Sequence, residues 1–198
     1  MTNSSEQPQD ADELILEGIV VTLDAAGVPN IAPMGPRVDR DVSRLTLRPF
    51  STSRTYQNLL SARRGVFHVT DDVELLAKAA VGQLSPLPAL CPLPTSGCQR
   101  LADACRWWAF EVEQIGDSTE RITIDCRVTS RGEIRPFLGF NRAKHAVLEA
   151  AILATRLHIL PAETINSEFK RLSTLIEKTA GHQERTAFAF LQEYIANS

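Results

Sequence analysis

The sequence has few lysines and no long apolar run. Only four lysines accompany its seventeen arginines. The net charge of −3 argues against the basic stripe with which proteins bind a nucleic-acid backbone. No apolar run approaches the roughly 20 residues that a membrane-spanning helix needs. We therefore expect neither a nucleic acid nor a membrane as partner, and a small molecule as substrate.

The signatures of several common catalytic sites are also missing. Neither GxxxxGKS/T nor GxGxxG occurs, which argues against a P-loop or a Rossmann nucleotide site. There is no GxSxG or HExxH motif, so the catalytic residues stay unknown. We expect free thiols and no metal site, because the cysteines form no CxxC pair and have no histidine cluster nearby. They are Cys91, Cys98, Cys105 and Cys126.

The first residues of the chain are polar and acidic. Residues 1–12 contain no apolar core of the kind found in a signal peptide. We expect them to form a disordered lead-in to a cytoplasmic protein.

Residues 13–135 have the pattern of a β domain with inserted helices. Two apolar segments, 14–24 and 30–39, flank a DAAG turn and predict a hairpin, although Pro33 and Pro36 interrupt its second strand. Further strands are expected at 43–50, 65–70 and in two longer segments after Cys105. Helices are expected at 52–64 and after Asp72, and the proline-rich segment 85–97 predicts an irregular connection.

Residues 136–198 are predicted to be helical. The segment 140–160 is rich in alanine and leucine at helical spacing, and two further helices are divided at Gly181. The predicted fold is therefore mainly β with helices (α+β): a β-barrel, then a helical C-terminal region that packs on the barrel or on a dimer interface.

The junction LRPFSTSRTYQNL (47–59) has the composition of an anion site. It places four hydroxyl residues and two arginines at a helix start, where unpaired N–H groups and the helix dipole favour a negative charge. One hydroxyl, Ser51 or Thr52, would be enough to cap the helix. The residues alone leave both interpretations open.

Six segments resemble a known family. EGIVVT, NIAPMG, LRPF, TYQNL, VTDD and FNRAKHAVLEAAILATRL occur in the same order in the DUF447 family of the FMN-binding split-barrel superfamily, whose members are flavin-reductase-like. The resemblance covers residues 14–160. It implies a homodimeric split β-barrel that binds FMN near the subunit interface.

The resemblance also implies which residues contact the flavin. Four residues would hold the phosphate: Arg48, Ser51, Ser53 and Thr55. Asn58 would fix the turn or reach the ribityl chain. The isoalloxazine ring would lie along Ala32, Pro33, Met34 and Gly35. The alternative for this last segment is a proline-kinked edge strand with no ligand.

Three residues of the VTDD and FNRA segments complete the expected site. Thr70 would contact the flavin, and Asn141 and Arg142 open a helix that faces the flavin, the substrate or the other subunit. The family pattern has Asn where this chain has His68, and a histidine in a strand is typically structural. Whether His68 alters the flavin site stays open.

Two classes of function follow from the resemblance. The first is a flavin-dependent oxidoreductase of unknown substrate, possible because the cofactor itself carries out hydride chemistry. Family members accompany tetrahydromethanopterin-dependent one-carbon metabolism, which suggests a pterin or a pathway intermediate. The second class is a non-catalytic FMN-binding module that serves as a carrier, sensor or pathway partner. A dimeric scaffold that holds no flavin is a third, simpler reading.

Overall fold

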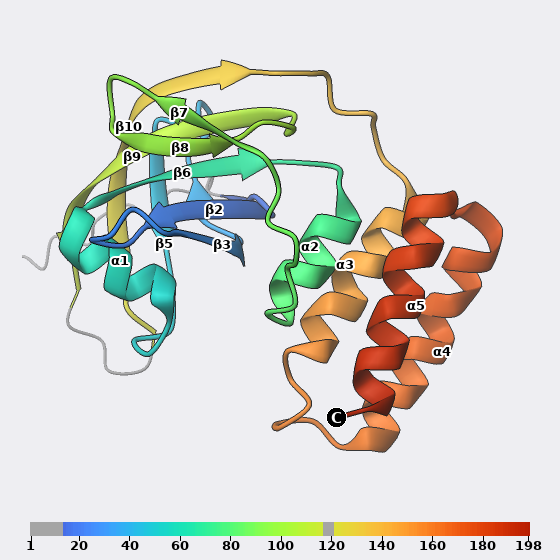
Figure 1. The fold of residues 1–198 in the computed structure, drawn as a ribbon. Coiled ribbons are helices and arrows are strands. Elements are labelled where there is room, and N and C mark those ends of the chain that lie inside the picture. Colours follow the sequence, from blue (N-terminus) through green and yellow to red (C-terminus); the bar gives the residue numbers. More distant parts are fainter. Residues whose placement is uncertain (1–13, 117–120) are drawn as a thin grey trace, which may run out of the picture.

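The computed structural model describes residues 14–116 and 121–198, so the expected lead-in at 1–12 lies outside the described residues. It consists of a curled antiparallel sheet on one side and a group of helices on the other (Figure 1). The sheet order is β1-β4-β5-β10-β9-β6-β2-β3. Its strands are β1 (Leu14–Ile15), β2 (Gly18–Leu23), β3 (Pro29–Met34), β4 (Arg37–Val38), β5 (Arg44–Leu47), β6 (Arg64–Val69), β9 (Arg106–Ile115) and β10 (Ile124–Glu133).

One bent hairpin curls the sheet into a split barrel. Strands β1 and β2 are successive parts of its first arm, and β3 and β4 are successive parts of its second arm. The arms pair with each other from Leu23 opposite Pro29 to Leu14 opposite Val38. The first arm also pairs with β6 through β2, whereas the second arm pairs with β5 through β4. Both edges of the sheet therefore belong to the same hairpin.

The bend lies where the predicted second strand is interrupted. Gly35 separates β3 from β4, and a Cβ placed on it would lie 2.9 Å from both Glu17 Oε1 and Ile15 Cγ2. Pro36 accepts a hydrogen bond from Leu16 N, which keeps the arms paired across the bend. The expected hairpin is confirmed, and Gly27 with a φ of 80° forms its turn.

Alternate residues of the strands supply two separate cores. Val20, Phe67 and Trp108 point into the barrel, where Phe67 and Trp108 stack with ring centroids 5.9 Å apart. Ile19 and Val21 point outward and pack against the helices. This alternation, with period 2, is what a sheet covered on both faces requires.

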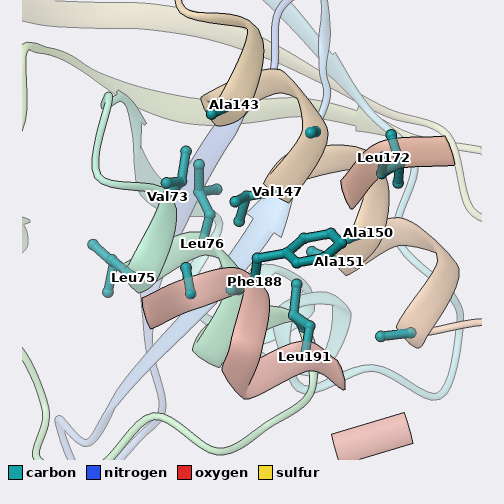
Figure 2. Close-up of a cluster of buried hydrophobic side chains, with 14 of the residues drawn as sticks. Val73, Leu75, Leu76, Ala143, Val147, Ala150, Ala151, Leu172, Phe188 and Leu191 are labelled. Carbon is teal, nitrogen blue, oxygen red and sulfur yellow. The ribbon is translucent and has the colours of Figure 1, made fainter. Parts of the chain in front are cut away.

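Four helices pack against one another beside the barrel, whereas the helix after β5 packs on the barrel itself. Their shared core joins the helix after β6 to the three C-terminal helices (Figure 2). Phe169 and Phe188 lie with ring centroids 5.4 Å apart in this core. The helices are α1 (Arg54–Ala62), α2 (Val73–Ala80), α3 (Arg142–Ala154), α4 (Ala162–Thr179) and α5 (His182–Ala196).

One predicted element was wrong. The segment 85–97 was expected to be irregular, but it contains β7 (Leu90–Leu93), which pairs with β8 (Cys98–Leu101) in a separate hairpin. The four prolines of this segment argued against a strand. A two-stranded hairpin needs few ladder hydrogen bonds, however, and it tolerates proline at its open edges. All four cysteines are free thiols, as expected.

His68 attaches the β7–β8 hairpin to the barrel. The side chain is fully buried, and its Nε2 accepts a hydrogen bond from Leu101 N at 3.0 Å. Its Nδ1 therefore carries the proton and donates to the Ile19 carbonyl at 3.3 Å. The histidine is structural, as its position in a strand suggested. Burial lowers its pKa to about 4, although the Ile19 hydrogen bond opposes this shift.

We predict that His68 makes folding stability depend on pH between about 6.5 and 4. The unfolded chain binds a proton at this histidine near pH 6.5 and the folded chain only near pH 4. Stability is thus full above pH 6.5 and falls by about 3 kcal/mol as the pH drops to 4. Urea unfolding at several pH values measures this slope.

The control for this prediction is His68→Gln, which keeps a neutral hydrogen-bonding side chain but cannot titrate. The carboxyl of Glu17 contributes the opposite slope, because burial and then Glu149 raise its pKa above 4.5. The difference between the wild type and the variant isolates the histidine. Equal slopes in the two proteins would contradict the prediction.

Candidate functional site

The start of α1 is the first part of the candidate site. Ser53 is its N-cap: the hydroxyl accepts from Tyr56 N at 3.2 Å and donates to Phe50 O at 2.8 Å. The cap is therefore Ser53, and not Ser51 or Thr52. No acidic residue occupies the first turn of α1, so its dipole has no internal counter-charge. This helix start can accept an anion, although the Ser53 hydroxyl is already engaged.

Of the predicted phosphate residues, Arg48 is the one that remains open to solvent or to a ligand among the described residues. Arg48 follows β5, is exposed, and forms no hydrogen bond or ion pair with any described residue. Ser51 lies half-buried in the turn, where its carbonyl accepts from Gln57 Nε2 at 3.2 Å. A guanidinium beside a helix N-terminus is a suitable pair of donors for phosphate oxygens.

Thr55 joins this helix start to β3. It is 3% exposed, and its Oγ1 accepts a hydrogen bond from Asn30 Nδ2 at 3.0 Å. Asn30 was not among the predicted contacts, although it opens the NIAPMG segment. The only sequence signal for it is a polar residue in an otherwise apolar strand. The contact holds the first end of β3 against the first turn of α1.

Asn58 has a structural use. Its Nδ2 donates to Thr22 Oγ1 at 3.0 Å, and the residue is 6% exposed. This bond fixes α1 to β2 on the side away from solvent. Of the two roles considered for Asn58, the structure favours fixing the local fold.

Strand β3 carries the residues expected beside the ring. It pairs only with β2, so one edge of its backbone has no partner strand among the described residues. Ala32, Pro33, Met34 and Gly35 are all partly buried along this edge strand. Alternate N–H and C=O groups of an edge strand point away from the sheet and can bond a ligand. The expected ring-binding segment therefore has an available backbone edge.

The remaining predicted residues lie at the other end of β3. Gly18 is opposite Met34, and Ile19 is opposite His68, so Thr70 lies close to the Met34 end. The Thr70 hydroxyl accepts from Asp72 N at 3.1 Å. Asp72 in turn caps α2. The predicted site thus divides into two groups of residues joined by β3.

Asn141 and Arg142 open α3. The Asn141 carbonyl oxygen accepts from Ala143 N and Lys144 N, and its amide donates to Thr179 O. Asn141 is the N-cap of α3, and both ends of its amide group bond to other residues of the protein. Arg142 is exposed and forms no ion pair with any described residue. Arg142 is therefore the residue of this pair that stays available to a ligand or partner.

A polar network between the barrel and the helices had no sequence signal. Lys144 Nζ bonds to Asp71 O at 2.7 Å, to Gln183 Oε1 at 3.0 Å and to Glu184 Oε1 at 2.7 Å. These contacts use all three donors of the ammonium group, so Lys144 is structural. Burial opposes ionisation of Glu184, but hydrogen bonds led by Lys144 outweigh it and lower its pKa.

Arg135 extends this network into the segment that links β10 to α3. It donates to Asp71 Oδ1 at 2.6 Å and to Asp103 Oδ1 at 2.7 Å. The Arg135 hydrogen bond holds the pKa of Asp71 below its ordinary value, although burial opposes the shift. An open pocket of about 590 Å³ lies beside these residues, with Phe137 and Leu138 in its wall. The charges of this pocket are already paired with one another.

Two family models match most of the chain. Residues 16–135 match the N-terminal domain model of a protein family of unknown function, DUF447, and residues 141–193 match its C-terminal model. The chain belongs to the DUF447 family. No curated protein matches it in sequence.

Several solved structures share the fold of this DUF447 chain. An FMN-bound DUF447 protein from Methanosarcina mazei is 25% identical with a TM-score of 0.79, covering 92% of this chain and 95% of its own. The 2-nitrobenzoate nitroreductase of Pseudomonas fluorescens is 18% identical with a TM-score of 0.52, covering 61% and 65%. A flavoredoxin from Methanosarcina acetivorans is 8% identical with a TM-score of 0.53, covering 63% and 75%. The Methanosarcina mazei protein covers nearly the whole chain, whereas the other two structures cover less of it and show only a shared fold.

We predict that Asp71→Asn destabilises the DUF447 fold by about 1–3 kcal/mol. The Asp71 side chain is 8% exposed, so its loss leaves Arg135 without a buried counter-charge. Urea unfolding at neutral pH gives the change in the free energy of unfolding.

Asp103→Asn is the matched control, because Asp103 binds the same guanidinium but its side chain is 77% exposed. An exposed ion pair contributes at most about 1 kcal/mol. Equal losses in the two variants would show that burial of Asp71 does not set the strength of the network.

Proposed function

We propose that this protein binds FMN, with the phosphate at the start of α1 and the isoalloxazine ring along β3. The observation that carries the proposal is the arrangement of an anion-accepting helix start and an open strand edge, joined by the bond between Asn30 and Thr55. Its support is the FMN bound to a 25% identical protein that matches over 92% of this chain.

The dimensions of β3 suit an extended flavin. From Asn30 to Gly35 the chain advances by roughly 17 Å at the usual rise per residue. This is close to the extended length of FMN from its phosphate to its ring. The phosphate would meet Arg48, Ser51, Thr55 and the first N–H groups of α1, while the ring would meet backbone groups of Ala32 to Gly35.

We propose further that the protein is a flavin-dependent oxidoreductase. When bound, FMN supplies hydride and electron transfer. The polar side chains next to β3, including Asn30, Thr55 and Thr70, already make structural hydrogen bonds. The protein's part is therefore to hold and orient the cofactor. A pterin of one-carbon metabolism is the substrate class that the family resemblance suggests.

The yellow colour of bound flavin tests FMN binding, and reduction of that flavin by an electron donor tests the oxidoreductase proposal. Purified protein that is colourless and takes up no added FMN would refute flavin binding. If it is yellow, anaerobic mixing with NADH or NADPH should bleach the flavin. A flavin that no nicotinamide or pterin donor reduces would favour the non-catalytic module.

We predict that Arg48→Ala weakens FMN binding by ~1.5–3 kcal/mol, because a charge-assisted hydrogen bond to the phosphate is lost. Riboflavin, which has no phosphate, should bind to the variant as it binds to the wild type. Fluorescence titration with both flavins measures the two affinities.

The control is Arg40→Ala, which removes the same charge from another exposed arginine. An unchanged FMN affinity in Arg48→Ala would remove this residue from the phosphate site. If Arg48→Ala lost affinity for riboflavin as well as for FMN, the substitution would act on binding of the ring or on the fold, and not on the phosphate.

We also propose that the protein is a homodimer. Phe137, Leu138 and Phe140 are large apolar residues that are 44%, 82% and 108% exposed in one chain. They lie together in the segment between β10 and α3. An apolar group of this kind on a single chain is typical of a surface that a partner covers.

The prediction for this surface is that Leu138→Glu shifts the protein toward a monomer. A charge on an apolar interface must be desolvated on association, which opposes it. Sedimentation velocity measures the change, and Leu87→Glu, at another exposed leucine, is the control. A wild-type protein that sediments as a monomer would refute the homodimer.

A further inference from the structure

Arg121 shares a face of the sheet with Arg48. Phe50 and Arg121 form an antiparallel bridge just beyond the pairing of Leu47 with Ile124. Directly paired residues point to the same face, as do residues two apart on one strand. Arg48, Phe50 and Arg121 therefore lie on one face, opposite the buried Leu47 and Ile124.

The Arg121 guanidinium is held in place by the Phe50 ring. Its central carbon lies 4.3 Å from the ring centroid, which is the geometry of a cation–π contact. Ile122 N donates to Pro49 O at 3.0 Å, so the backbone on both sides of the contact is also fixed. A long side chain that is already held loses less entropy when it binds a ligand.

This guanidinium lies beside the start of α1. Phe50 O accepts a hydrogen bond from Ser53 N at 3.0 Å. The residue whose ring stacks with Arg121 is therefore bonded directly to the N-cap of α1. The helices α2, α4 and α5 each have an acidic residue in the first turn, whereas α1 and α3 have none. No described carboxylate forms an ion pair with Arg48 or Arg121, although several other arginines of the chain are paired.

We propose that Arg121 is a second phosphate-binding residue and favours flavins that end in a phosphate monoester. The inference rests on the proposed function. A terminal phosphate carries close to two negative charges at pH 7. Two guanidinium groups and a helix N-terminus match that charge, whereas one guanidinium leaves part of it uncompensated.

The test compares FMN with riboflavin in Arg121→Ala. We expect FMN affinity to fall about tenfold, which is the effect of one charge-assisted hydrogen bond. Riboflavin affinity should be unchanged, and the salt dependence of FMN binding should become weaker. Phe50→Leu, which keeps Arg121 but removes the ring beneath it, should reduce FMN affinity by a smaller factor.

Arg156→Ala is the matched control, because Arg156 is exposed beyond the end of α3 and forms no ion pair with a described residue. Equal FMN affinity in Arg121→Ala and the wild type would overturn the inference. So would an equal loss for FMN and riboflavin. If the wild type binds neither flavin, the proposed function itself fails, and this outcome is distinct from both of the others.

Discussion

The bend in the β1–β4 hairpin is the constraint on which the rest of the structure depends. It lets one arm pair with β6 and the other with β5, so a single hairpin provides both edges of the barrel sheet. Gly35 leaves room at the bend for the side chains of Glu17 and Ile15, which a Cβ there would have to displace. The bend also leaves β3 without an outer partner strand among the described residues, and the candidate flavin site is built along that open edge.

Two sets of polar contacts hold the elements around this edge. At one end of β3, the bond between Asn30 and Thr55 joins the strand to α1. At the other end, Lys144 and Arg135 both bond to Asp71, which follows β6. Both sets consist of buried or half-buried groups that bond to other parts of the protein. They fix the geometry of the site, and the groups left for a ligand are backbone atoms, exposed arginines and the start of α1.

Much of this fold could be predicted from the sequence, because its strongest signals are local. The two apolar segments around the DAAG turn predicted the first hairpin, and the alanine- and leucine-rich segment 140–160 predicted α3. The β7–β8 hairpin was missed because prolines mask a short strand. The contacts of Arg135 with Asp71 and of Lys144 with Gln183 join residues far apart in the chain, so no local pattern could reveal them. Nor could a local pattern reveal the contact of Arg121 with Phe50, because the two residues meet only when their segments pair.

The prolines of β3 have a further consequence. An open strand edge is a template for another strand, and proteins that keep one must prevent association between edges. Pro29 and Pro33 lie on β3 and carry no N–H group, so a foreign strand cannot form a continuous ladder along it. The residues that leave room for a planar ligand therefore also protect the protein against aggregation whenever that ligand is absent.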